Sequence, residues 1–336
     1  METPSFWKTS LEAVDRAYLN ASKAEKAILT LSAGGRPVYM LAYGPKKAHA
    51  SQANYSSALG AHDRACFSNP LNTQKTLILI GAEHGQETEG VAALMNLIAL
   101  METGRDLAGA ENAALTAALE GMRLVIVPVA NPDGRARVEP EGIIGLTGRE
   151  LRYWGQGTWA DGSLCGWPEC KKVHPIKGYG FLGGYYNDDG INLMHDNFFH
   201  PMARETQALL DLCEREQADM VLHLHGGSNA RGTLLQPAYV PVEVNQAILT
   251  LSQRCYDAGA AEGLAFDRLA IPEPAHGENP PTFNLICAVH HVCGAVSVCY
   301  ESNECLIDEP GPHRTHAEVV RMHMILFEQA ARMLTE

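Results

Sequence analysis

The side chains best suited to chemistry lie in residues 81–87, whose sequence is Gly-Ala-Glu-His-Gly-Gln-Glu. His84 and Glu87 are three residues apart, and side chains at this spacing share one face of a helical turn. An imidazole nitrogen and a carboxylate on one face can bind the same divalent cation. Two His and one Glu form a catalytic zinc set that leaves the fourth position for water. The pair therefore predicts a metal-dependent hydrolase, provided that a third ligand lies elsewhere.

This pair lies between a strand predicted over residues 76–80 and a helix predicted over residues 90–102. The strand is a short apolar run, as buried strands are. Ligands of open α/β sheets bind beyond the carboxyl ends of the strands, and the pair lies at such an end. The alternative interpretation is a surface pair on a helix, because His-x-x-Glu occurs by chance in many proteins.

A second predicted strand, over residues 218–225, ends in two histidines. The alternation of side chains along a strand places His223 and His225 on the same face. His225 stands at the strand end against a Gly-Gly turn that leaves room for a ligand, so it is the candidate third metal ligand. His223 is interpreted as a core histidine or as a residue that supports the ligands.

A third predicted strand, over residues 295–300, brings a carboxylate towards the same edge. A bound metal lowers the pKa of its water to near neutrality, and a general base must then take the proton. Glu301 directly follows this strand and is the candidate base, with Glu304 as the alternative. The competing interpretation makes Glu301 a solvated loop residue.

Composition narrows the class of protein. The 336 residues are 46% hydrophobic and carry a formal net charge of −13, which argues against a nucleic-acid partner and against an anionic membrane surface. We expect no membrane span and no signal peptide. The nine cysteines indicate reduced thiols and a cytoplasmic protein. Cys165 and Cys170, with His174 nearby, are a weaker candidate for a second metal site than for free thiols in a loop.

Alternating strands and helices predict an α/β fold, with a mixed, mostly parallel sheet covered by helices on both faces. The chain shows no linker, repeat or low-complexity tract, so a single domain over residues 1–336 is expected. Residues 135–189 are predicted to be a long, loop-rich segment that shapes the pocket. The remaining predicted strand segments are residues 37–43 and 122–129, and the remaining predicted helices are residues 10–31, 110–119, 201–217, 243–264 and 316–334.

Together these segments resemble the zinc carboxypeptidases, the carboxypeptidase A-like metallopeptidases. The resemblance covers residues 75–306 in the family's order and rests on residues 81–87, Asn131-Pro132-Asp133-Gly134 after a strand, His225 and Glu301. It implies one α/β domain with about eight strands and one zinc ion per chain. It also implies that His84, Glu87 and His225 hold the zinc and that Glu301 is the general base.

The chain departs from the family where substrate binds. Members usually grip the substrate carboxylate with an Asn-Arg pair, but the matching residues 190–198 contain no Arg. Asn192, His195 and Asp196 are therefore the candidate substrate-binding residues there. A bidentate Arg–carboxylate contact is hard to replace with His or Asp. We therefore expect poor cleavage of ordinary carboxypeptidase substrates.

The family's oxyanion-stabilising Arg usually follows a Trp, whereas Trp154 is followed by Gly155 in this chain. Arg152 is the candidate catalytic arginine, and Arg149 is a candidate substrate-binding residue. Either arginine, or a protonated His195, could rescue a carboxylate site.

The aspartoacylase and succinylglutamate desuccinylase group is also similar, since its motif has Gly after the His. It suggests an N-acyl amino acid deacylase as the alternative enzyme. A catalytically inactive zinc-binding interaction module is the other alternative, although a retained base argues against it. The expected partner is a peptide or small amide substrate, and the oligomeric state stays open.

Overall fold

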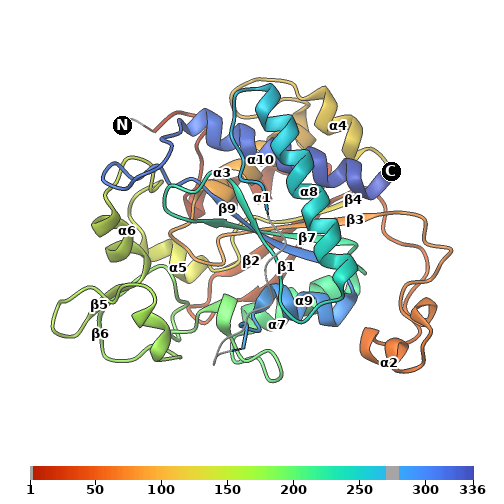
Figure 1. Ribbon diagram of the computed structural model, residues 1–336, viewed down its shortest axis with the longest axis horizontal. Helices are drawn as coiled ribbons and strands as arrows, with labels where there is room; N and C mark the ends of the chain where they lie inside the picture. The colour runs from red at the N-terminus through yellow and green to blue at the C-terminus, as the bar shows by residue number, and fades with distance from the viewer. Residues whose placement is uncertain (1–2, 270–279) are drawn as a thin grey trace.

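The computed structural model describes residues 3–269 and 280–336. At its centre is a mixed sheet of seven strands, which crosses the middle of the molecule in Figure 1. In spatial order these are β1 (Glu25–Leu31), β2 (Pro37–Tyr43), β4 (Arg123–Val127), β3 (Thr76–Gly81), β7 (Met220–Gly226), β9 (Val296–Ser302) and β8 (Thr233–Leu235). The four strands from β4 to β9 are parallel, and the remaining strands join antiparallel at the two edges.

Side-chain alternation along the strands divides the interior into two cores. Leu77 and Leu79 of β3 face one core, and Ile78 and Ile80 face the other. Five helices supply residues to the first core: α1 (Leu11–Asn20), α3 (Glu89–Thr103), α4 (Ala113–Leu119), α8 (Val242–Ala261) and α10 (His316–Thr335). The opposite core is covered by α2 (Tyr55–Gly60), α7 (Arg204–Arg215) and α9 (Leu285–Cys293) (Figure 1). The predicted α/β sheet with helices on both faces is therefore confirmed.

One predicted helix is too long. The sequence predicts a helix from residue 10 to residue 31, but α1 ends at Asn20 and β1 follows it. β1 is an edge strand with a mostly exposed or half-buried pattern, so its sequence carries little of the apolar signal of a core strand. Its pairing with β2 gives the backbone of this segment its hydrogen-bond partners, which local helix propensity cannot predict.

The long segment after β4 contains short elements rather than one structureless loop. These are α5 (Pro132–Arg137), α6 (Gly148–Gly155), η2 (Glu169–Lys172) and the hairpin of β5 (Gly157–Trp159) with β6 (Tyr179–Leu182). A small core of its own holds the hairpin region together, and Cys165, Cys170, Tyr185 and Tyr186 are part of it. Two further short turns are η1 (Arg64–Cys66) and η3 (Leu193–His195). Across the described residues, no helix has the length and apolarity needed to cross a membrane.

Candidate active site

The site lies at the carboxyl edge of the parallel strands. The chain leaves β3 through a tight turn at residues 82–87 before α3 begins at Glu89. His84 and Glu87 therefore lie in this turn, just before the helix on which the sequence placed them. Gly85 fits because the turn packs against the start of α5: a Cβ atom there would lie 2.1 Å from the backbone nitrogen of Arg135. Asn131 caps α5 by accepting a hydrogen bond from the backbone nitrogen of Gly134 at 2.8 Å. The turn at residues 82–87 therefore packs against a capped helix start formed by residues 131–134.

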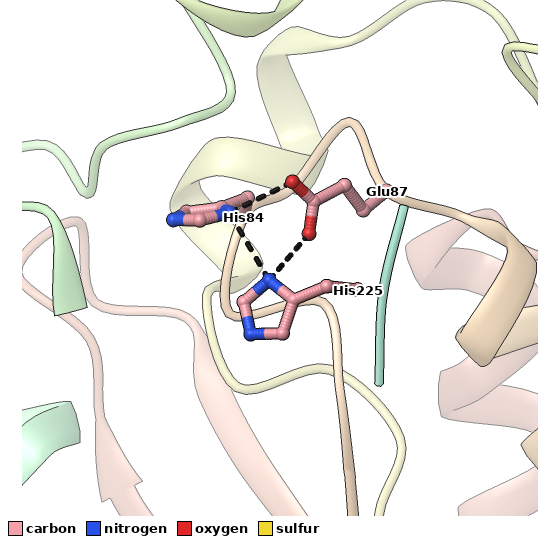
Figure 2. A group of neighbouring side chains, drawn as sticks. All are labelled: His84, Glu87 and His225. Carbon is pink, nitrogen blue, oxygen red and sulfur yellow. Dashed lines mark hydrogen bonds and ion pairs between the residues drawn. The ribbon is translucent and has the colours of Figure 1, made fainter. Parts of the chain in front are cut away.

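The three predicted metal ligands converge (Figure 2). Nδ1 of His84 lies 2.8 Å from one carboxylate oxygen of Glu87, and Nδ1 of His225 lies 2.7 Å from the other. The two Nδ1 atoms are 3.3 Å apart. All three side chains are buried. Two imidazole nitrogens and a carboxylate that point at one another form a donor set that suits a divalent zinc ion.

Glu87 is ionised in this setting. Burial opposes its charge, but the neighbouring imidazoles of His84 and His225 outweigh burial and lower its pKa to about 2. The same interactions with Glu87 and Glu83 raise the pKa of His225 well above its ordinary value, against the effect of burial. Glu87 therefore supplies a buried negative charge where a cation would be held.

Glu301 lies beside the predicted metal ligands. It is the register partner of His225 on the neighbouring strand β9, and residues paired in register have neighbouring side chains on one face. Burial raises its pKa to about 7, and the negative charge of Glu87 adds to this rise. The structure therefore places a carboxyl group that titrates near neutrality next to the metal ligands, as the interpretation of Glu301 as a base requires.

Glu304, the alternative base, also lines the pocket. Its carboxylate accepts a hydrogen bond from the backbone nitrogen of Ser228 at 2.6 Å. Burial and the nearby carboxylates raise its pKa well above the ordinary value. It is thus anchored to the loop that follows β7, whereas Glu301 stands directly beside His225.

A cavity of about 820 Å³ contains these groups. Its walls include Leu151, Arg152, Gln156, Trp167, Lys171 and Tyr185 from the segment that the sequence predicted to be loop-rich and pocket-forming. Tyr185 stacks on the imidazole of His84 at 3.8 Å between ring centroids. The volume lies in the range of small-molecule binding pockets.

The chain was compared with known proteins. The sequence model of the zinc carboxypeptidases matches residues 11–237. The chain belongs to the zinc carboxypeptidase family. No curated protein matches it in sequence.

Solved metallo-carboxypeptidases of this family share the fold. One from Burkholderia cenocepacia is 14% identical with a TM-score of 0.56, and the match covers 95% of this chain. Another, from Pseudomonas aeruginosa in complex with (2-guanidinoethylmercapto)succinic acid, is 18% identical with a TM-score of 0.53 and the same coverage. This chain spans 66% of the length of each of these two proteins.

Membership in the zinc carboxypeptidase family identifies zinc as the metal that the buried triad fits, one ion per chain. His84, Glu87 and His225 are the one group of this kind among the described residues. Cys165 and Cys170 are buried, unpaired thiols in the small core of the hairpin region.

Of the substrate-binding residues predicted around position 195, two reach the site of this zinc carboxypeptidase family member and one does not. Asn192 reaches the site, where its amide oxygen lies 3.2 Å from Nε2 of His84. His195 lines the cavity. The carboxylate of Asp196 is buried and accepts from the backbone nitrogens of Asn197 and Ala203, at 2.7 and 3.0 Å, so it stabilises its own loop.

The two candidate arginines also differ. Both side chains are exposed, but Arg152 lines the cavity and lies 3.6 Å from Glu309, whereas Arg149 does not line it. The roles of both arginines stay predictions.

Sequence reasoning missed Lys171. Its Nζ lies 2.9 Å from Nε2 of His195 and 5.3 Å from the ring centroid of Trp167. Burial, with help from the Lys171 charge, lowers the pKa of His195 to about 3, so this imidazole is neutral and accepts from the ammonium. The cation near the expected carboxylate site is therefore Lys171, and not a protonated His195. No local pattern marks Lys171, because its relation to His195 depends on how the hairpin region folds over the sheet.

Proposed function

We propose that this chain is a zinc-dependent hydrolase of peptide or amide bonds, acting in the manner of a carboxypeptidase. The observation that carries the proposal is that His84, Glu87 and His225 meet Glu301 inside one cavity. These side chains come from the ends of three separate strands. Together they supply three ligands for a metal ion and a carboxylate that can act as a base.

Bound zinc supplies Lewis-acid chemistry, because it acidifies a water molecule and polarises a carbonyl group. Glu301 accepts the proton of the attacking water and delivers it to the leaving nitrogen, since an amine leaves readily only when protonated. A pKa raised to about 7 suits a group that must take up and release a proton near neutral pH. Its neighbour in register is His225, so the Glu301 carboxylate lies beside the predicted ligands.

The cations of the cavity support a substrate that carries a carboxylate. Among the described residues that line it, Lys171 and Arg152 are the lysine and arginine side chains. Lys171 is held by His195, and its charge is positioned to bind a substrate carboxylate. Arg152 is the remaining candidate for stabilising an oxyanion, although its side chain is half-exposed and lies 3.6 Å from Glu309. A cytoplasmic location is part of the proposal, and nine unpaired cysteines, eight of them buried, support a reducing compartment.

The test is a substrate panel with zinc-loaded protein. The panel contains N-blocked peptides with a free C-terminal carboxylate, the same peptides as C-terminal amides, and single N-acyl amino acids. Release of a C-terminal amino acid from the free acids supports the proposal. Hydrolysis of N-acyl amino acids alone identifies a deacylase. Full zinc occupancy without any hydrolysis identifies an inactive zinc-binding module. Chelator-treated protein is the control for adventitious activity.

A further inference from the structure

A chain of buried polar side chains runs behind the metal site. Oε2 of Glu83 lies 3.1 Å from Nε2 of His225, and Oε1 lies 2.5 Å from Nδ1 of His223. Nε2 of His223 in turn lies 3.1 Å from the hydroxyl of Ser297. All four residues are at most 2% exposed.

When Nδ1 of His225 holds a metal ion, the chemistry of the other groups allows one arrangement of protons. An ionised carboxylate can only accept hydrogen bonds, so both imidazole nitrogens that face Glu83 must carry protons. Nε2 of His225 is therefore the protonated nitrogen, and Nδ1 is free to offer its lone pair to a metal ion held between His84 and Glu87. His223, protonated at Nδ1, leaves Nε2 to accept from Ser297.

The two imidazole ligands differ in what supports them. Nε2 of His225 faces the carboxylate of Glu83, whereas Nε2 of His84 faces the neutral amide oxygen of Asn192 at 3.2 Å. A carboxylate behind a ligating imidazole fixes the tautomer and makes the ligand more basic. Glu83 immediately precedes His84 in the chain, so one turn of backbone carries both a metal ligand and the support for another.

We propose that Glu83 is a positioning residue that holds His225 in its metal-binding tautomer and strengthens zinc binding, with His223 and Ser297 holding Glu83 in place. The inference rests on the zinc site of the proposed function. It does not depend on which bond the protein hydrolyses.

The first test compares Glu83→Gln with the wild type in zinc affinity, measured by competition with a chromogenic chelator. Gln has the same shape and can still accept from His225, and it can donate to Nδ1 of His223 once that ring takes its other tautomer, so the variant removes the charge and keeps the space filled. We expect zinc binding to weaken about 10- to 100-fold, the usual effect of losing such a partner. Glu205→Gln is the matched control, because Glu205 is a buried carboxylate that contacts Asn187 and not the triad.

A fall in zinc affinity in Glu83→Gln, with Glu205→Gln unchanged, supports the proposal. Equal zinc affinity in wild type and a folded Glu83→Gln protein overturns it. Loss of zinc binding in the wild type itself would instead remove the metal site and the proposed function together. Zinc binding without hydrolysis would remove only the proposed function.

The second test keeps the inference falsifiable if Glu83→Gln does not fold. Long-range proton–nitrogen NMR spectra of the zinc-loaded wild type identify which nitrogen of His225 carries a proton. We expect a proton on Nε2, shifted downfield by its bond to a carboxylate. A proton on Nδ1, with Nε2 as the coordinated nitrogen, overturns the proposal whatever the variants do.

Discussion

The ammonium group of Lys171 lies 2.9 Å from Nε2 of His195, on the wall of the cavity that contains the metal ligands. His195 is neutral because its pKa is lowered to about 3, so it acts as a fixed acceptor that aims the Lys171 charge. A single ammonium is a point charge without the bidentate geometry of an arginine. It can nevertheless bind a carboxylate at the place where the sequence lacks the family's arginine.

The first prediction concerns Lys171→Gln. We expect kcat/KM for a peptide with a free C-terminal carboxylate to fall about 10- to 100-fold, since a charge-assisted hydrogen bond contributes about 1.5–3 kcal/mol. The C-terminal amide of the same peptide should be nearly unaffected. The measurement is kcat/KM for both substrates at two pH values.

Lys172→Gln is the matched control, because Lys172 is the exposed neighbour that pairs with Glu169 at 2.5 Å and does not line the cavity. If Lys171→Gln keeps the preference for the free acid and Arg152→Gln abolishes it, Arg152 is the anchor. A preference that disappears as pH rises through about 6.5, the ordinary histidine range, would return the role to a protonated His195.

The second prediction concerns the base. Only an ionised Glu301 can accept a proton, so kcat/KM should fall as pH falls through its pKa. Burial raises that pKa from 4.5 to about 7, and the positive charge of bound zinc acts in the opposite direction. We therefore expect the acid limb of the pH profile between these two values.

Glu301→Gln should keep zinc, lose about 10²-fold or more in activity, and lose this limb. Glu304→Gln serves as the comparison, because Glu304 lies in the same cavity but is anchored to Ser228. A mild Glu301→Gln effect beside a severe Glu304→Gln effect would transfer the role to Glu304.

The third prediction concerns metal and stability. A ligand that binds only the folded state stabilises it by an amount that grows with the logarithm of the ligand concentration over Kd. Zinc should therefore raise the Tm of the wild type, and chelator should lower it. Glu301→Gln should show the same zinc-dependent shift. A His84→Ala and His225→Ala double variant should show none, and elemental analysis should find about one zinc per chain in the wild type only. A double variant that keeps both the zinc and the shift would disprove the site.

The sequence predicted which side chains converge because they lie at the ends of apolar core strands. β3, β7 and β9 are short apolar runs: His84 follows the end of β3, and His225 and Glu301 are the second-last residues of β7 and β9. Since the strands are parallel, their ends meet at one edge of the sheet. Knowing the strands was thus enough to bring His84, His225 and Glu301 together.

The cavity wall could not be predicted in the same way. Lys171 and Tyr185 belong to a segment of short elements whose contacts are set by the hairpin and its own small core. Such contacts leave no period in the sequence, unlike a strand or an amphipathic helix. Glu83 escaped notice for another reason: its role becomes visible only when the ends of β3 and β7 are known to be neighbours.

The last prediction concerns a histidine outside the site. His323 of α10 is fully buried between Tyr300 and Phe327, and its Nδ1 donates to the backbone oxygen of Val319 at 2.8 Å. Burial lowers its pKa from 6.5 to about 4. Between these values the unfolded chain binds a proton that the folded chain does not. His323 should therefore make the free energy of unfolding decrease as pH falls from 6.5 to 4, and have no effect above 6.5.

The slope from one such group approaches about 1.4 kcal/mol per pH unit inside that window. His323→Leu removes the titrating group, so urea unfolding at several pH values should show a shallower acid loss of stability than in the wild type. Slopes are compared rather than absolute stabilities, because the substitution also changes packing against Tyr300. His313→Leu, at an exposed histidine, is the control for replacing a histidine by leucine as such. Parallel stability curves for the wild type and His323→Leu would show that folding does not change the pKa of His323.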